Sequence, residues 1–277
     1  MEGMGMATAV QAVILAAGRG TRLQKPDPTV VLDPETEAIV KQGIKALVPI
    51  GGRSFLDYSI HRLMDAGIRR VCLILAPCSE PLEAYVNALP ERFPGLSASI
   101  AVQPEAKGTA HALRFARQAT GDGDFLMLNS DNLYPDSALR DMADSPAGVS
   151  YACGFDQESL VAESNIESSR LSQLGILVPR SDDPDALERV VEKPSDPSVY
   201  RRDGRLWVTM NLWRFTPDIY DFCDHAQSSP RGEFELTSAV QDLSDSGRPI
   251  RMIRSREGVL DLTSRADIFR LQSILCP

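Results

Sequence analysis

The sequence predicts an α/β fold, a three-layer sandwich with helices covering a central, mostly parallel sheet. Residues 10–16 form an apolar run that ends at Gly18 and Gly20, which is typical of a strand buried on both faces. Helical and strand patterns then alternate as far as Cys153, as expected of βαβ units. Beyond Cys153 the alternation loosens, so mixed or antiparallel strands are expected in the second half.

The elements of the first half follow from apolar spacing and capping residues. Ser54 can cap a helix whose apolar residues fall at positions 56, 60, 63 and 64, and Gly67 can close it. By the same reasoning we expect strands at 71–75, 98–102, 125–128 and 148–153, and helices at 81–89, 109–118 and 137–143.

The second half predicts strand-like segments at 175–178, 189–191 and 206–215, followed by helices at 217–224 and 236–244. Residues 250–253 and 258–261 resemble a final pair of strands. Thr263 can cap a terminal helix in which Ile268, Leu271 and Leu275 share a face. Ligands of such sheets bind at the carboxyl ends of the strands, so the residues after each strand are the candidates for a site.

Composition excludes several classes of function. The chain has 277 residues with 29 Lys and Arg against 38 Asp and Glu, a net charge of -9, which argues against nucleic acid or an anionic membrane as partner. A bound polyanion must therefore meet a local basic pocket. No apolar run approaches the length of a membrane span. The five cysteines form no C-x-x-C pair, so neither a disulfide framework nor a zinc site is indicated, and a reducing cytoplasm fits best.

The loop after the first strand is a candidate phosphate site. Its small residues would let backbone N–H groups approach phosphate oxygens, and Arg22 can add charge-assisted bonds. The alternative is a tight turn with a solvated arginine. A G-x-G-x-x-G motif would need glycine where Leu23 stands, and no Walker-type motif occurs, which disfavours a dinucleotide oxidoreductase or a Walker ATPase. The loop comprises Leu15, Ala16, Ala17, Gly18, Arg19, Gly20, Thr21, Arg22 and Leu23.

Two aspartates are candidate metal ligands. Asp131 follows the apolar strand at 125–128, and Asp261 follows another strand-like segment. Carboxylates from separate strands suit Mg²⁺, which fills its remaining positions with phosphate and water. Read alone, either aspartate could be a turn or helix-capping residue.

Three further polar residues stand at strand ends. Lys193 lies where Pro194 stops a strand, so its amine could reach a phosphate; the alternative is an ion pair with Glu192. Lys45 precedes an apolar run, and its alternative is a solvated residue entering a strand. Gln103 offers an amide donor and acceptor to the imide edge of uracil or thymine, although such a glutamine is often a surface residue.

The loop at 15–23 resembles the signature loop of the sugar-1-phosphate nucleotidylyltransferases, the family that includes glucose-1-phosphate thymidylyltransferase and uridylyltransferase. Six further segments resemble that family in order, so the likeness covers residues 10–265. The resemblance implies a Rossmann-like fold of the nucleotide-diphospho-sugar transferase type. The segments are 45–50, 103–110, 131–134, 192–194, 231–237 and 261–264.

The resemblance implies a role for each matching residue. Arg22, Lys45 and Lys193 would be the catalytic cations, with Arg22 holding the departing pyrophosphate and Lys45 contacting the triphosphate. Asp131 and Asp261 would bind Mg²⁺. The nucleotide would contact Leu15, Ala16, Ala17, Gly18, Gly20, Thr21, Gln103, Gly108 and Thr109, and the sugar phosphate would contact Asn129, Glu192, Lys193, Asn211 and Glu235.

The implied activity joins a nucleoside triphosphate, with UTP or dTTP favoured, to a sugar 1-phosphate and releases pyrophosphate. One domain over 1–277 would contain a nucleotide-binding part at about 8–150 and a sugar-binding part at about 151–277. Alternatives are a nucleotidylyltransferase using GTP or CTP with another phosphorylated acceptor, or a non-catalytic nucleotide-sugar sensor. The implied partners are these small molecules, with no nucleic acid or membrane, and relatives are often homo-oligomers.

The chain departs from the family pattern in ways that leave the sugar open. Residues 24–43 form an insertion between Arg22 and Lys45, and Ile44 stands where the family has proline. This insertion could be a lid, an allosteric element or an oligomer contact. Asn129-Ser130 and Asn211 occupy positions where glycine is common. We interpret His61, His111 and His225 as structural, and Trp207 and Trp213 as core or pocket wall.

Overall fold

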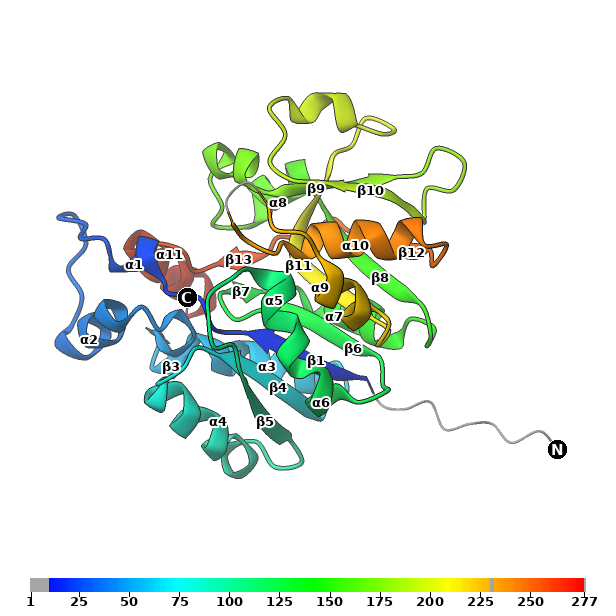
Figure 1. Cartoon of the computed structure of the whole chain (residues 1–277). Coiled ribbons are helices and arrows are strands. Elements are labelled where there is room, and N and C mark those ends of the chain that lie inside the picture. Colours follow the sequence, from blue (N-terminus) through cyan, green and yellow to red (C-terminus); the bar gives the residue numbers. More distant parts are fainter. Residues whose placement is uncertain (1–9, 230–231, 277) are drawn as a thin grey trace.

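A computed structural model describes residues 10–229 and 232–276 (Figure 1). Its nine-stranded sheet has the order β10-β9-β11-β6-β1-β4-β5; in addition, β8 pairs with β11, and β12 pairs with β8. The strands are β1 (Gln11–Leu15), β4 (Arg70–Leu75), β5 (Ser97–Val102), β6 (Phe125–Asn129), β8 (Ser150–Asp156), β9 (Gly175–Pro179), β10 (Leu187–Val191), β11 (Trp207–Phe215) and β12 (Ile250–Ser255).

The sheet is parallel in the first half of the chain and mixed in the second. β1 pairs in parallel with β4 and β6, and β4 pairs in parallel with β5. β11 runs antiparallel to β6, β8 and β9. The predicted fold class is therefore confirmed, including the change of pattern after Cys153.

Two groups of helices cover the two faces, and each buries an apolar cluster. Figure 1 shows α5, α6 and α9 in front of the sheet. One face carries α3 (Phe55–Asp65), α4 (Glu80–Arg92), α7 (Asp136–Asp144) and α8 (Gln157–Glu163). The other carries α5 (Thr109–Leu113), α6 (Arg117–Thr120), α9 (Ile219–His225) and α10 (Leu236–Asp245).

A third apolar cluster joins the insertion to the end of the chain. Figure 1 shows α1, α2 and α11 together at one end of the molecule. Asp33 caps α2 by accepting a hydrogen bond from the Thr36 amide (2.9 Å), and Gly43 ends it in the left-handed conformation. The elements here are α1 (Thr21–Gln24), α2 (Pro34–Gln42), β2 (Pro49–Ile50), β3 (Arg53–Ser54), β7 (Asn132–Leu133), β13 (Leu260–Asp261) and α11 (Arg265–Leu275).

The structure corrects several predicted details. Residues 250–253 and 258–261 do not pair with each other: β12 joins β8, and β13 joins β7. Ser264, not Thr263, caps α11, because its hydroxyl and the Asp267 carboxylate form a reciprocal capping box. The helix predicted at 109–118 is broken by a 3-10 turn at Arg114–Ala116. Lys45 begins a 3-10 helix, Lys45–Leu47, and does not enter a strand directly.

Asn211 marks an irregularity in β11. The pairing register of β11 with β8 shifts between Thr209 and Trp213, and Asn211 lies there with φ of 58°. Glycine and asparagine are the residues that adopt this left-handed conformation most readily. Asparagine can therefore replace the glycine common in the family at this position.

Tyr134 connects the two halves of the fold. Its ring is buried, and its hydroxyl donates a hydrogen bond of 2.6 Å to the carbonyl oxygen of Met210 in β11. The bond therefore adds a buried side-chain contact between the segment after β6 and β11, and β6 and β11 also pair along their strands.

We predict that Tyr134→Phe lowers the free energy of unfolding by about 1–3 kcal/mol, because a buried carbonyl loses its donor. Chemical denaturation measures the change. Tyr200→Phe is the control, since the Tyr200 hydroxyl forms no hydrogen bond with the residues that the structure describes. Equal stability of the two variants would contradict this role for Tyr134.

Candidate active site

A cavity of about 720 Å³ opens at the carboxyl ends of β1 and β6. The loop after β1, the segment around Gly108 and the end of the insertion form its wall. Among the predicted residues, its lining includes Leu15, Ala16, Ala17, Gly18, Gly20, Thr21, Lys45, Gln103, Gly108, Thr109, Asn129 and Asp131.

A smaller cavity of about 190 Å³ adjoins the first, since Asn129 and Asp131 line both. Four of the remaining predicted residues line it, namely Arg22, Lys193, Asn211 and Asp261, together with Arg170 and Asn132, which the sequence did not single out. Glu192 and Glu235 are not among the described residues that line either cavity, whereas Glu233 lines the larger one. Arg231, in the predicted segment 231–237, lies outside the described residues.

The loop after β1 contains one open and one tightly packed glycine. No atom of the described residues lies within 4 Å of the position where Gly18 would carry a Cβ, so its backbone is accessible to a ligand. Gly20 has φ of 58°, and a Cβ there would lie 2.3 Å from the Gly43 carbonyl oxygen. The end of the insertion thus packs directly on the loop.

The insertion is held in place by a buried arginine. The Arg265 guanidinium forms two bonds to the Glu37 carboxylate in α2, of 2.5 and 3.0 Å, and a third of 3.0 Å to the Lys25 carbonyl oxygen. Arg265 is 7% exposed and is the first residue of α11. It therefore connects the insertion to the segment that carries Asp261.

Asp131 and Lys45 form an ion pair at the boundary of the two cavities. The Lys45 ammonium lies 2.8 Å from Asp131 Oδ2, and its side chain is 17% exposed. Lys45 is thus not the solvated lysine of the alternative interpretation. It comes from the 3-10 helix directly after the insertion, so the position of the insertion determines where its amine lies.

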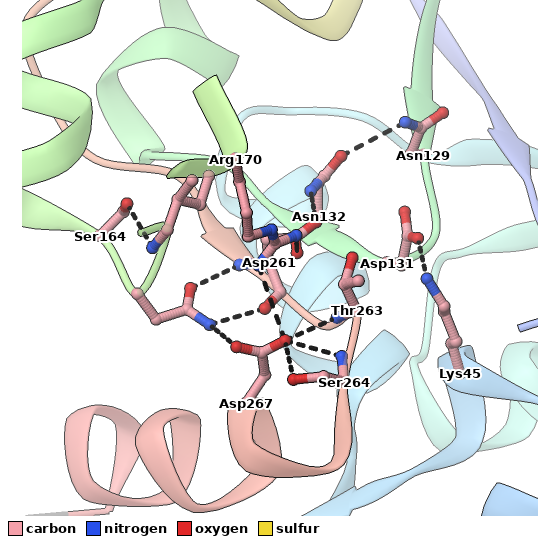
Figure 2. A network of polar contacts seen from close by, with 12 residues as sticks. Lys45, Asn129, Asp131, Asn132, Ser164, Arg170, Asp261, Thr263, Ser264 and Asp267 are labelled. Atoms are coloured by element: carbon pink, nitrogen blue, oxygen red, sulfur yellow. Dashed lines mark hydrogen bonds and ion pairs between the residues drawn. The ribbon is translucent and has the colours of Figure 1, made fainter. Parts of the chain in front are cut away.

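Asp261 is brought beside Asp131 by the short pair of strands β7 and β13, in which Asp261 faces Asn132. The Asn132 amide donates to Asp261 Oδ1 at 2.9 Å, and the guanidinium of Arg170 pairs with Oδ2 (Figure 2). The Asn165 side chain bonds both the backbone amide and the carbonyl of Asp261, at 2.8 and 2.7 Å. These contacts hold both the carboxylate and the backbone of Asp261 in place.

The electrostatics of Asp261 suit a bound cation. Burial raises the pKa of the Asp261 carboxyl, and the negative charge of Asp131 raises this pKa further, against the opposing effect of Arg170. The described residues contain no cluster of three or more His, Cys, Asp or Glu that could enclose a metal by themselves. A carboxylate in the turn between β6 and β7 and another at the end of β13 fit Mg²⁺, which takes its other ligands from phosphate and water.

Gln103 is buried at the end of β5 and is not the surface residue of the alternative interpretation. Its amide donates to the Gly108 carbonyl oxygen at 3.1 Å and lies 3.1 Å from His111 Nδ1. Gly108 has φ of 100°, and a Cβ there would lie 2.5 Å from the backbone oxygen of Phe234. His111 is thus structural in the sense that it orients Gln103.

Lys193 lies two residues after the end of β10, has φ of 42° and lines the smaller cavity. Trp213 is fully buried and Trp207 is 6% exposed, as expected of core residues. The functional candidates missed by sequence reasoning are Arg170 and Asn165, which stand outside every motif segment, and Arg265. Only the capping pattern around Asp33 and Pro34 could have revealed the helix that Arg265 anchors.

The arrangement is that of an enzyme acting on phosphates: a small-residue loop, paired carboxylates and several cations meet at the end of a parallel sheet. A model of the nucleotidyl transferase family matches residues 11–271. The chain belongs to this family.

Individual relatives agree with this assignment. The chain is 30% identical to a UTP–glucose-1-phosphate uridylyltransferase of Haloferax volcanii, and the match covers 91% of each. It is 28% identical to a glucose-1-phosphate thymidylyltransferase of Streptomyces griseus, over 87% of this chain and 59% of that relative. Among solved structures, UDP-glucose pyrophosphorylase with UDP-glucose has a TM-score of 0.73 at 18% identity, covering 97% of this chain and 98% of the other.

The described residues contain no helix with the length and apolar character needed to cross a bilayer.

We predict that Gly20→Ala lowers turnover roughly 10²-fold, because the new methyl group would displace the loop from Gly43 and misplace the phosphate contacts. Steady-state kinetics and circular dichroism measure activity and fold. Gly52→Ala is the matched control, since Gly52 also has a positive φ, 79°, but its Cβ would meet no described atom within 4 Å. Equal loss of activity in both variants would show that the contact between Gly20 and Gly43 is not important.

Proposed function

We propose that the protein transfers a nucleotidyl group from a nucleoside triphosphate, UTP or dTTP, to a sugar 1-phosphate, giving an NDP-sugar and pyrophosphate. The observation that carries the proposal is the meeting of Asp131 and Asp261 where two cavities adjoin. The larger cavity has the size and the small-residue loop suited to a nucleotide. The smaller one carries cations suited to a phosphate.

The reaction is a direct displacement. A phosphate oxygen of the sugar 1-phosphate attacks the α-phosphorus, the bond from that phosphorus to the bridging oxygen breaks, and pyrophosphate leaves with the electron pair. No protein nucleophile is needed, so the chain contributes positioning and charge stabilisation. Mg²⁺ bound by Asp131 and Asp261 would supply charge neutralisation on the phosphates.

Each cation has a place in this scheme. The loop amides around Gly18 bind the triphosphate, and Lys45, which lines the same cavity, contacts it as well. Arg22 stabilises the pyrophosphate as negative charge develops on it. Lys193, in the smaller cavity, orients the phosphate of the sugar so that its oxygen faces the α-phosphorus.

A pyrimidine base is supported by two independent features. Gln103 is buried and lines the larger cavity; its amide nitrogen already contacts Gly108 and His111, so its amide oxygen is the group that can accept a hydrogen bond from the N–H of a uracil or thymine imide edge. The names of the two relatives above specify UTP in one case and thymidylyl transfer in the other. Glu192, Asn129, Asn211 and Glu235 remain proposed sugar contacts.

The proposal places the reaction in the cytoplasm, where nucleoside triphosphates are made, and takes the two small substrates as the partners. The five cysteines are free thiols, consistent with a reducing compartment. Homo-oligomerisation and the division into a nucleotide-binding and a sugar-binding part remain predictions.

The experiment is pyrophosphate release with Mg²⁺ across a grid of UTP, dTTP, CTP, GTP and ATP against several sugar 1-phosphates. Release that requires both substrates and is strongest with UTP or dTTP is the expected result. Preference for GTP or CTP would point to the alternative base or acceptor. Nucleotide-sugar binding without release across the grid would contradict the enzyme and favour a sensor.

We predict that Asp131→Ala and Arg22→Ala keep the fold and lower turnover by roughly 10²–10³-fold or more, because each removes one preorganised charge. The same pyrophosphate assay with the preferred pair measures the loss, and circular dichroism checks the fold. Asp122→Ala is the control, because Asp122 is exposed, precedes the amino end of β6 and lines neither cavity. Near-normal turnover in a folded Asp131→Ala protein would refute the metal assignment.

A further inference from the structure

Both candidate metal ligands carry a cation of this chain as their partner. Lys45 pairs with Asp131, and Arg170 pairs with Asp261 (Figure 2). Arg170 lies in the 3-10 helix Ser168–Gln173, which no motif segment includes. It also lines the smaller cavity together with Lys193 and Arg22.

We propose that Arg170 is a further substrate-contacting residue, which binds the phosphate of the sugar 1-phosphate beside Lys193 and pairs with Asp261 while no divalent cation is bound there. The inference rests on the function proposed above and assigns one more contact to the same site. Its planar guanidinium presents two parallel N–H donors, which match the oxygens of a phosphate.

The surroundings of the pair show which partner can move. Asp261 is fixed by Asn132 and by two bonds from Asn165, and its side chain is 9% exposed. The Arg170 side chain is 26% exposed and borders the cavity. Arg170 can therefore turn toward a ligand, whereas the Asp261 carboxylate stays in place.

A second carboxylate near Arg170 is already satisfied. Asp267 lies 3.7 Å from Arg170, but its Oδ2 accepts hydrogen bonds from the amides of Thr263 and Ser264, at 3.1 and 2.7 Å. Asp267 thus caps α11 without needing the arginine. Departure of Arg170 leaves only Asp261 in need of a positive charge.

Charge balance then links the metal to the sugar phosphate. A buried carboxylate without a counterion is costly, so Arg170 is released when a divalent cation takes its place at Asp261. The released guanidinium and Lys193 then supply two positive charges for the sugar phosphate in the cavity of about 190 Å³ that both residues line. Binding of the divalent cation therefore strengthens binding of the sugar phosphate, and the reverse holds by linkage.

The first test is thermal unfolding of Arg170→Gln without substrates, in EDTA and in Mg²⁺. We expect a lower Tm than wild type in EDTA, because Asp261 loses its counterion, and a larger rise in Tm on adding Mg²⁺, because its competitor is gone. Arg270→Gln is the matched control: Arg270 forms an exposed pair of 2.6 Å with Glu167 in the same region. A Mg²⁺-induced rise equal to wild type would overturn the competition between Arg170 and the metal.

The second test is steady-state kinetics with the preferred substrates. Loss of a charged phosphate contact should raise the KM for the sugar 1-phosphate by about 10–100-fold in Arg170→Gln, with the KM for the nucleoside triphosphate nearly unchanged. Arg170→Lys keeps the charge without the planar guanidinium, so its KM for the sugar 1-phosphate should fall between those of wild type and Arg170→Gln. It replaces Arg170→Gln if that variant does not fold. An unchanged sugar KM, or equal rises in both KM values, would overturn the contact.

Failure of the proposed function is distinguishable from failure of this inference. If the wild type releases no pyrophosphate from any pair of substrates, the proposed function is wrong. Calorimetric titration of the protein with glucose 1-phosphate in the presence of Mg²⁺ then replaces the kinetics. Weaker binding to Arg170→Gln than to wild type would still support the contact. Equal binding to the two, or none to wild type, would overturn it.

Discussion

The approach of two like-charged carboxylates, Asp131 and Asp261, is the constraint on which the rest of the site depends. The antiparallel pair β7 and β13 imposes it, because Asp131 directly precedes one strand and Asp261 ends the other. Repulsion at such close range is unfavourable in a buried place. Lys45 and Arg170 offset it within this chain, and a divalent cation with phosphate ligands would offset it during the reaction.

The insertion at 24–43 also helps to position the residues of the site. Through Arg265 its helix is tied to α11, whose first turn follows Asp261 by only a few residues. Through Gly43 it packs on the phosphate loop, and it leads directly into Lys45. The loop, the lysine and the second carboxylate are thereby set by one packed unit, so a displacement of the insertion would disturb all three at once.

Much of this could be predicted from the sequence where local signals were strong. The apolar run before Gly18 and the alternation of helical and strand patterns after it predict the sheet. The residues that follow β1 and β6 predict the position of the cavity. These signals are reliable because strand burial and loop composition are local properties. Tertiary pairing is not local: the sequence predicts that 250–253 and 258–261 form a pair of strands, whereas β12 pairs with β8 and β13 pairs with β7.

The sequence does not single out Arg170 and Arg265 for the same reason. Arg170 reaches Asp261 across 91 positions of sequence, and Arg265 reaches Glu37 across 228. Neither stands in a motif with a chemical signature of its own. The fold had to be known before either arginine could be placed at the site.

The most direct measurement of the central claim is anomalous diffraction from crystals grown with Mn²⁺, as a substitute for Mg²⁺, and a nucleoside triphosphate. The account predicts an anomalous peak between the carboxylates of Asp131 and Asp261, with phosphate oxygens completing the coordination. An anomalous peak at another place, with Lys45 and Arg170 still paired to the two aspartates, would contradict the account.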